Sequence, residues 1–368
     1  MSAYVPEFSS EPEPEAPRPL ALTHDPLLLD DLLRLAAVAG AELEVAADPG
    51  AVRRSWRSAP LVLVGSDCAA EVARRELPRR AATILVGRDP DDGAVWQQAL
   101  AIGAEQVAIL PDCEGWLGER LADAAEGPRA TGRTVCVVGG RGGAGASTLA
   151  TALAVTAANR GLVTTLIDGD PLGGGLDFLL GEEQAEGFRW PDLAEVSGRV
   201  SSTALRLALP TFGRLSLLSW DRGKVLRVPP EAMQVALAAG RRGSDLVVVD
   251  LPRQHPDLAS EPALAAGGPV LVVVPADVRS VAAAARVVAA LDEHTSDLRV
   301  VVRGPSPSNL SPQMIAASLG LPLLGSVRPE PRRTHRQDRG EPPGVQHRSP
   351  LAGLCGRFLD SLALGAAA

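Results

Sequence analysis

A glycine-rich segment of the sequence carries the residue types needed to bind phosphate. Gly139-Gly-Arg-Gly-Gly-Ala-Gly-Ala-Ser-Thr148 lies between an apolar run and an alanine-rich run. Glycines let successive backbone N–H groups face an anion, and a helix amino terminus adds partial positive charge. The spacing from Gly140 to Gly145 matches a phosphate-binding loop, but Ala146 occupies the lysine position. A glycine-rich turn without a ligand is the alternative interpretation.

Three aspartates follow predicted strands in the same region. Asp168 and Asp170 come after the apolar run 163–167, and Asp250 comes after the run 246–249. Because ligands bind at the carboxyl ends of parallel strands, we expect these carboxylates to lie beside the glycine-rich segment. A carboxylate in this position is the usual partner of magnesium or of the water held beside it. Together the two features favour a nucleotide site.

These residues need a parallel sheet to position them. Apolar runs alternate with helical patterns from residue 134 onward, which is typical of an α/β fold. The predicted strands are 134–138, 163–167, 215–218, 246–249, 270–274, 300–302 and 323–326. The predicted helices are 147–159, 230–239, 278–291 and 351–363. The leucines of the last helix form a stripe that favours core packing over a membrane anchor.

The same alternation occurs earlier in the chain and predicts a second, smaller parallel sheet. Its strands are expected at 20–23, 41–46, 61–64, 83–86 and 106–110, with helices at 26–39, 52–56, 93–102 and 116–125. Proline and glutamate dominate the preceding residues, a composition that cannot bury a core. We therefore predict a disordered tail at 1–19, a first domain at 20–125, a linker at 126–133 and a second domain at 134–368.

Composition limits the classes of partner and compartment. The 368 residues carry 36 lysines and arginines against 44 acidic residues, a net charge of -8, so any nucleic-acid contact must be a local patch. The four cysteines are far apart and form no CxxC pair, which argues against a zinc cluster or disulfide framework. The acidic amino terminus does not resemble a secretory signal, and the apolar runs are too short to span a bilayer. We expect a cytoplasmic protein with no stable membrane insertion.

The second domain resembles the MinD/ParA family of deviant P-loop ATPases over 134–364. The resemblance rests on the glycine-rich segment and on 166–181, 247–252 and 275–291, and Gln337-Asp-Arg-Gly-Glu-Pro342 is similar to a late nucleotide-side loop of that family. Alanine at the lysine position, after a receiver-like domain, is similar to the CpaE/TadZ branch and the Ssd-like septum-site-determining proteins of actinobacteria. This resemblance implies a mainly parallel central sheet.

The resemblance also implies a role for each site position. ATP would contact Gly140, Gly142, Gly143, Ala144, Gly145, Ala146, Ser147, Thr148 and Asp168. Magnesium would be held by Ser147 and, through water, by Asp250. Arg141 stands where the family has the signature lysine that reaches the partner subunit's phosphates. Asp170 matches the acid that positions the attacking water.

Departures from the family pattern predict a weakened site. Replacing the loop lysine with Ala146 removes a charge-assisted contact of roughly 1.5–3 kcal/mol, or about 10- to 100-fold in affinity. Hydrolysis should suffer more than binding, because the transition state concentrates charge near that missing ammonium. In addition, Val302-Arg303 replaces an Asn-Arg pair that helps read adenine, and Arg253-Gln254 replaces an Ala-Gly pair. We expect weak binding of ATP and magnesium with impaired hydrolysis.

The first domain resembles a response-regulator receiver over 20–125, but lacks most of its chemistry. A working receiver needs an acidic pair after the first strand, an aspartate ending the third and a lysine after the fifth. This chain has His24-Asp25 after the first strand, and Gly65 after the third with Asp67 out of step. Leu110-Pro111 replaces the lysine and its proline. We predict a degenerate, protein-binding receiver; the alternative is a phosphoacceptor at Asp67.

The leading functional hypothesis is a MinD-related regulator that acts through protein contacts. It would influence septum-site selection and cell division, or the positioning of pilus or secretion machinery, as a homodimer whose state nucleotide sets. Recruitment to the septum or pole would follow from such a role. One alternative is an active MinD/ParA-type ATPase in which Arg141 compensates for the lost lysine. Another is a ParA-like protein that binds DNA through the arginine-rich stretch 328–348.

Overall fold

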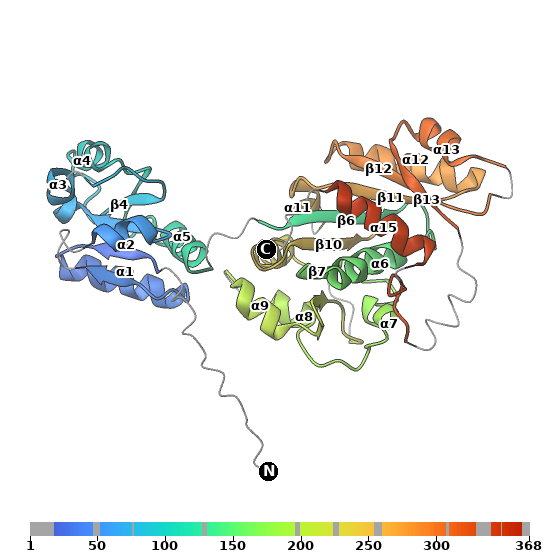
Figure 1. Cartoon of the computed structure of the whole chain (residues 1–368), viewed down its shortest axis with the longest axis horizontal. Coiled ribbons are helices and arrows are strands. Elements are labelled where there is room, and N and C mark those ends of the chain that lie inside the picture. Colours follow the sequence, from blue (N-terminus) through green and yellow to red (C-terminus); the bar gives the residue numbers. More distant parts are fainter. Residues whose placement is uncertain are drawn as a thin grey trace, which may run out of the picture. The chain divides into compact units, whose positions relative to one another are not determined.

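The computed structural model shows two compact units, 1–129 and 130–368 (Figure 1). The residues that the structure describes are 18–46, 52–75, 77–126, 131–195, 199–223, 228–253, 260–306, 309–328, 340–346 and 348–362. Most of the predicted tail, part of the predicted linker and most of the arginine-rich stretch 328–348 lie outside these ranges. Each unit is described by itself.

The first unit is a five-stranded parallel sheet covered on both faces, which confirms the receiver-like fold. Its strands are β1 (Leu20–Leu22), β2 (Glu44–Ala46), β3 (Val62–Gly65), β4 (Thr83–Gly87) and β5 (Gln106–Ile109). They lie in the order β2-β1-β3-β4-β5. The central strands are fully buried on both faces, and Thr83 is their one polar side chain.

Five helices cover this sheet (Figure 1). They are α1 (Pro26–Val38), α2 (Arg53–Ser58), α3 (Ser66–Arg74), α4 (Val95–Ile102) and α5 (Glu114–Glu126). The apolar sides of α1 and α5 pack on one face, and those of α2, α3 and α4 pack on the other. The sequence prediction omitted α3, whose buried face consists of small side chains, Cys68, Ala69 and Val72.

The second unit contains an eight-stranded, mainly parallel sheet, which confirms the predicted fold class; the sequence prediction gave seven of these strands and omitted β8 (Thr211–Phe212). Its strands are β6 (Arg133–Gly139), β7 (Thr164–Asp168), β8 (Thr211–Phe212), β9 (Leu215–Leu218), β10 (Leu246–Leu251), β11 (Val270–Pro275), β12 (Leu298–Arg303) and β13 (Leu323–Val327). Their order is β13-β12-β11-β6-β10-β7-β9-β8, and only the short strand β8 runs antiparallel to its neighbour. The glycine-rich segment therefore leaves the sheet from a central strand, β6.

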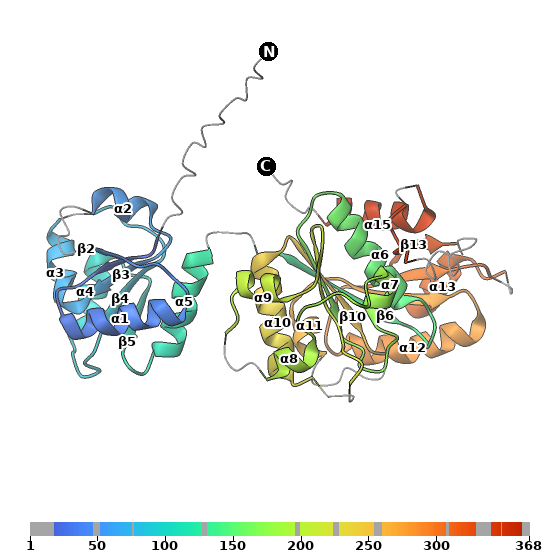
Figure 2. The ribbon, with the colours of Figure 1, turned by 90° about the horizontal axis from the view of Figure 1, so that it is seen from below.

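Helices sandwich this sheet (Figure 2). One face carries α6 (Ala146–Asn159), α7 (Leu176–Leu180) and α15 (Pro350–Ser361). The other carries α8 (Trp190–Ala194), α9 (Ser202–Ala208), α10 (Pro230–Gly243), α11 (Glu261–Ala265), α12 (Val278–Asp292) and α13 (Pro312–Leu319). The sequence prediction missed α7, α8, α9, α11 and α13, which are too short to show a clear helical period.

The alanine-rich helix α6 is buried along nearly its whole length between the sheet and α15. Small side chains allow this close approach, and the leucine stripe of α15 packs into the same core. At the carboxyl end of α6, Arg160 donates hydrogen bonds to the Gly356 carbonyl oxygen at 3.0 Å and to Asp360 Oδ1 at 2.7 Å. Among the described helices, none has the length and apolarity needed to cross a bilayer.

Candidate functional site

The glycine-rich loop joins the end of β6 to the first turn of α6. Its backbone has φ of +67° at Gly143 and +101° at Gly145, a left-handed conformation that glycine adopts without steric cost. Between them, Ala144 is buried against the core under the loop. Because α6 begins at Ala146, the first-turn N–H groups of the helix and the loop N–H groups belong to one anion-binding arrangement.

This loop forms one wall of a cavity of about 710 Å³ at the carboxyl edge of the sheet. The cavity collects nearly all residues that the sequence assigned to the site: Arg141, Gly142, Gly143, Ala144, Gly145, Ala146, Ser147, Thr148, Asp168, Asp170 and Asp250. Gly140 instead lines a neighbouring apolar cavity. A Cβ at Gly140 would lie only 2.7 Å from the Ala284 Cβ, so this glycine allows α12 to pack against the loop.

Two buried carboxylates line one side of the cavity, its floor, where a bound cation would stabilise their ionised form. Asp250 and Asp168 are 3% and 2% exposed. Burial raises the pKa of Asp250 to about 8, with the Asp168 and Asp170 carboxylates adding to the effect. Burial likewise raises the pKa of Asp168 to about 6. A bound cation would relieve this repulsion, and the all-oxygen character of the group suits magnesium.

The hydroxyl of Ser147 connects the loop to this acidic floor. It faces the Asp250 carboxylate and lowers its pKa, which partly offsets the effect of burial. A hydroxyl and a carboxylate from two different elements thus face the same point of the cavity. This is the donor set that a magnesium ion bound beside a phosphate requires, so the residues present fit the ion and nucleotide that the sequence predicts.

The carboxylate of Asp168 organises the loop that follows β7. Its Oδ2 accepts hydrogen bonds from Ser219 Oγ at 2.9 Å and from the Leu176 N–H at 3.1 Å, and its Oδ1 accepts the Asp170 N–H at 3.3 Å. Trp190 Nε1 donates to the Asp168 carbonyl oxygen at 2.6 Å. The loop is therefore fixed at both ends, and it holds Asp170 half-buried at the cavity wall.

The guanidinium of Arg141 bonds to the start of α12. Its Nε donates to Ser280 Oγ at 2.5 Å, its Nη1 donates to the Gly142 carbonyl oxygen at 3.0 Å, and its Nη2 lies 3.8 Å from Asp277 Oδ2. Asp277 in turn caps α12 by accepting the Ser280 N–H at 2.9 Å. The sequence left the direction of Arg141 open. In the structure, the guanidinium lies beside the acidic residue that caps α12.

Two further arginines line the cavity and were not assigned to it from the sequence. Arg303, at the end of β12, places its Nη1 3.3 Å from the point that a Cβ on Gly145 would occupy. The guanidinium carbon of Arg253 lies 4.0 Å from the corresponding point on Gly142. From the sequence, these two arginines stand out only because they depart from the MinD/ParA pattern. Their proximity to the loop follows from the sheet order, which brings β12 and β10 to either side of β6 and β11.

In the first unit, the carboxylate of Asp67 is bonded to the turn that follows β1. It accepts Thr23 Oγ1 at 2.9 Å, the His24 N–H at 2.6 Å and the Asp25 N–H at 3.2 Å. Burial of this carboxylate raises its pKa, but the hydrogen bonds outweigh burial, so the pKa of Asp67 is lowered overall. Asp25 caps α1 by accepting the Leu27 N–H at 2.9 Å. The residues matched to receiver chemistry thus serve to hold local structure.

Comparisons with known proteins place the chain in a family. The Mycobacterium tuberculosis protein Rv3660c is 41% identical over 344 residues, which cover 92% of this chain and 96% of that protein. The chain belongs to the Rv3660c family. A family model described as "Rv3660c-like, CheY-like N-terminal domain" matches residues 22–133, in agreement with the receiver-like sheet of the first unit.

Outside this family, the likeness concerns the second unit. A putative septum site-determining protein MinD of Oltmannsiellopsis viridis is 24% identical over 233 residues, 61% of this chain and 73% of that protein. A ParA family ATPase from Chlorobium tepidum aligns with a TM-score of 0.56 at 18% identity, over 64% of this chain and all of that one. The Pyrococcus furiosus cell division ATPase MinD aligns at 0.51 with 20% identity, over 62% and 99%. The second unit of this Rv3660c relative therefore has the MinD/ParA fold.

Proposed function

We propose that this Rv3660c-family protein is a CpaE- or Ssd-like regulator that binds ATP and magnesium weakly and hydrolyses ATP slowly. One observation carries the proposal. The phosphate loop, the Ser147 hydroxyl and the carboxylate of Asp250 converge on one cavity, while Ala146 offers only a methyl group where a lysine would supply charge. The framework for binding is present without the cation that usually serves catalysis.

Each wall of the cavity has a separate part in this proposal. The N–H groups of the loop and of the first turn of α6 would hold the phosphates, and Ser147 with Asp250 would hold magnesium. Arg303 and Arg253 supply positive charge at the two sides of the loop, in place of the missing lysine. Bound ATP would supply a cleavable phosphoanhydride and a state that a partner can recognise.

Slow hydrolysis would follow from the contacts of Arg141, which bind its guanidinium outside the phosphate position. Asp170 is held at the cavity wall, where it can orient water, but Arg141 is bonded to Ser280 and to the Gly142 carbonyl and lies near Asp277. Replacing those bonds requires α12 to give up contacts at its cap. The alternative, an ATPase that depends on Arg141, predicts that Arg141→Ala abolishes turnover. Our proposal predicts that this variant leaves the low rate of the native protein unchanged.

The cellular role rests on the MinD/ParA fold of the second unit and the altered chemistry of both units. The Aquifex aeolicus MinD of similar fold was solved in a complex with MinC, a cell-division protein. We infer that this chain acts by docking, as a nucleotide-influenced homodimer, on division proteins or on pilus or secretion machinery in the cytoplasm. DNA binding through 328–348 is not part of the proposal, because most of that stretch lies outside the described residues.

Binding and turnover are measured separately to test the proposal. Titration with a fluorescent ATP analogue should show saturable, magnesium-dependent binding, which Ser147→Ala weakens. Steady-state phosphate release should stay near background and rise in Ala146→Lys. Native hydrolysis at a rate typical of MinD proteins, lost in Asp170→Ala, would refute the slow-hydrolysis proposal, and absence of any magnesium-dependent binding would refute the nucleotide site itself.

The docking role has its own test in cells. Overproduction should alter cell length or septum placement, and a fluorescent fusion should collect at the septum or pole. Ser147→Ala should reduce both effects if nucleotide controls docking. Normal cell length together with an evenly distributed fusion would contradict the regulatory role.

A further inference from the structure

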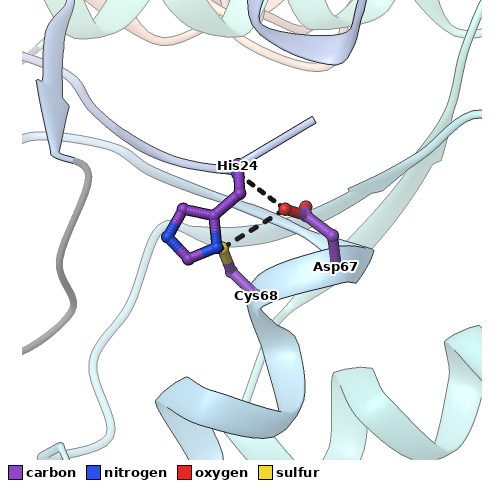
Figure 3. A group of neighbouring side chains, drawn as sticks. All are labelled: His24, Asp67 and Cys68. Atoms are coloured by element: carbon purple, nitrogen blue, oxygen red, sulfur yellow. Dashed lines mark hydrogen bonds between the residues drawn. The ribbon is translucent and has the colours of Figure 1, made fainter. Parts of the chain in front are cut away.

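Three chemically different side chains meet at the carboxyl edge of the first sheet (Figure 3). His24 follows β1, and Asp67 and Cys68 lie in the first turn of α3, directly after β3. β1 pairs with β3 in parallel, so the ends of both strands reach the same edge. One ligand atom from each of the three side chains lies within 4.8 Å of the other two. This cluster has no part in the nucleotide cavity of the second unit.

The spacing around the sulfur matches a metal coordination shell. Cys68 Sγ lies 3.5 Å from His24 Nδ1 and 3.4 Å from Asp67 Oδ2. Zinc binds sulfur at about 2.3 Å and nitrogen or oxygen at about 2.0–2.2 Å, which places neighbouring ligand atoms of a tetrahedral ion about 3.5 Å apart. Both other ligand atoms therefore lie at ligand-to-ligand distance from the sulfur.

The surrounding backbone holds the cluster in place. The carboxylate of Asp67 is fixed on both oxygens: Oδ2 accepts the N–H groups of His24 and Asp25, and Oδ1 accepts Thr23 Oγ1. A Cβ at Gly65 would lie 2.2 Å from Asp67 Oδ1, so only glycine leaves room for this arrangement. Cys68 is buried and His24 is exposed, which leaves one side of the cluster open to water.

The thiol of Cys68 contacts both polar groups of the cluster: its proton can be donated to Asp67 Oδ2, and the sulfur can accept from His24 Nδ1 when that nitrogen carries the ring proton. A dication would instead bond all three groups at once. Burial, followed by the Asp67 carboxylate, raises the pKa of this thiol to about 12, so it is not an activated nucleophile. Binding of a dication would release the thiol proton to solvent.

We propose that the first unit binds a zinc-class divalent cation through His24 Nδ1, Asp67 Oδ2 and Cys68 Sγ, with water as the fourth ligand. Sulfur and imidazole favour zinc or cobalt over magnesium, whereas the all-oxygen floor of the nucleotide cavity favours magnesium. The two units thus bind different metals. The site replaces the acidic chemistry of a receiver with a structural link between the turn after β1 and the start of α3.

Cobalt(II) provides a direct probe, because a cobalt–thiolate bond gives a near-ultraviolet charge-transfer band and tetrahedral cobalt gives intense visible bands. The full-length protein is stripped with chelator, supplied with excess magnesium to occupy the nucleotide cavity, and titrated with Co²⁺. We expect one equivalent to produce both signals and Zn²⁺ to displace them. Cys68→Ser should remove the charge-transfer band, and His24→Gln should weaken binding by roughly tenfold or more.

Cys113→Ser is the matched control, because it removes a half-buried thiol of the same unit outside the cluster. Its spectrum should equal that of the native protein. Absence of the band in native protein, or its persistence in Cys68→Ser, would overturn the proposal. If Cys68→Ser unfolds, His24→Gln decides, since its exposed side chain tolerates substitution: zinc should raise the melting temperature of the native protein by more than that of this variant. Equal zinc stabilisation of both proteins would also overturn the proposal.

Discussion

Replacing Arg303 by alanine tests whether a distant strand supplies the charge that the phosphate loop lacks. The guanidinium approaches Gly145 at the side of the loop next to Ala146, with its Nη1 3.3 Å from the Cβ point of that glycine. A hydrogen bond to a charged group contributes about 1.5–3 kcal/mol, which converts to roughly 10- to 100-fold in affinity. Arg303→Ala should therefore raise the dissociation constant for magnesium-ATP by a factor in that range.

The assay is a titration with a fluorescent ATP analogue at fixed magnesium and ionic strength. Arg206→Ala is the matched control, because it removes the same charge from an exposed position on α9 in the same unit. Arg303→Lys should fall between the native protein and Arg303→Ala, since lysine keeps the charge and loses the planar donors. An affinity for Arg303→Ala within twofold of the control would refute the reasoning and leave Arg253 as the main source of charge.

Three further results are expected. Ala146→Lys should tighten magnesium-ATP binding by about tenfold or more in the same titration, because it restores a charge-assisted contact. Burial raises the pKa of Asp250 to about 8, from roughly 3.9 in an unfolded chain, so its ionisation costs folded-state stability as pH rises through that interval. In chelator, Asp250→Asn should therefore raise the melting temperature near pH 8 and have little effect near pH 4. Incubation with a small phosphodonor should leave the mass of the protein unchanged, because the hydrogen bonds that Asp67 accepts would be lost on phosphorylation; a phosphate mapped to Asp67 would contradict this.

The fold was readable from the sequence because its strands are strong local signals. Residues 246–249 of β10 and 270–274 of β11 are all apolar, as expected for strands buried on both faces. The five-residue helices α7, α8 and α11 gave no such signal, since one turn and a half does not establish a period. Their positions depend on packing against the sheet, which local sequence does not encode.

The candidate site was only partly readable for a related reason. The loop and the acids after β7 and β10 were located because each follows a strand directly. Arg303 lies far from the loop in sequence, and only the order β12-β11-β6 brings it near. The same holds for His24 and Cys68, which the adjacency of β1 and β3 places together. The expectation of no zinc cluster rested on the spacing of the cysteines alone, so it did not consider a group of mixed ligands such as the one proposed here.

The packing of α6 against α15 has a consequence for biosynthesis. The helix that starts at the phosphate loop is covered by residues that follow it by about 200 positions, as the bond from Arg160 to Asp360 shows. During translation, α6 emerges long before its cover and exposes an apolar side to solvent or to chaperones. Nascent chains that end before α15 should therefore be recognised by chaperones as incomplete.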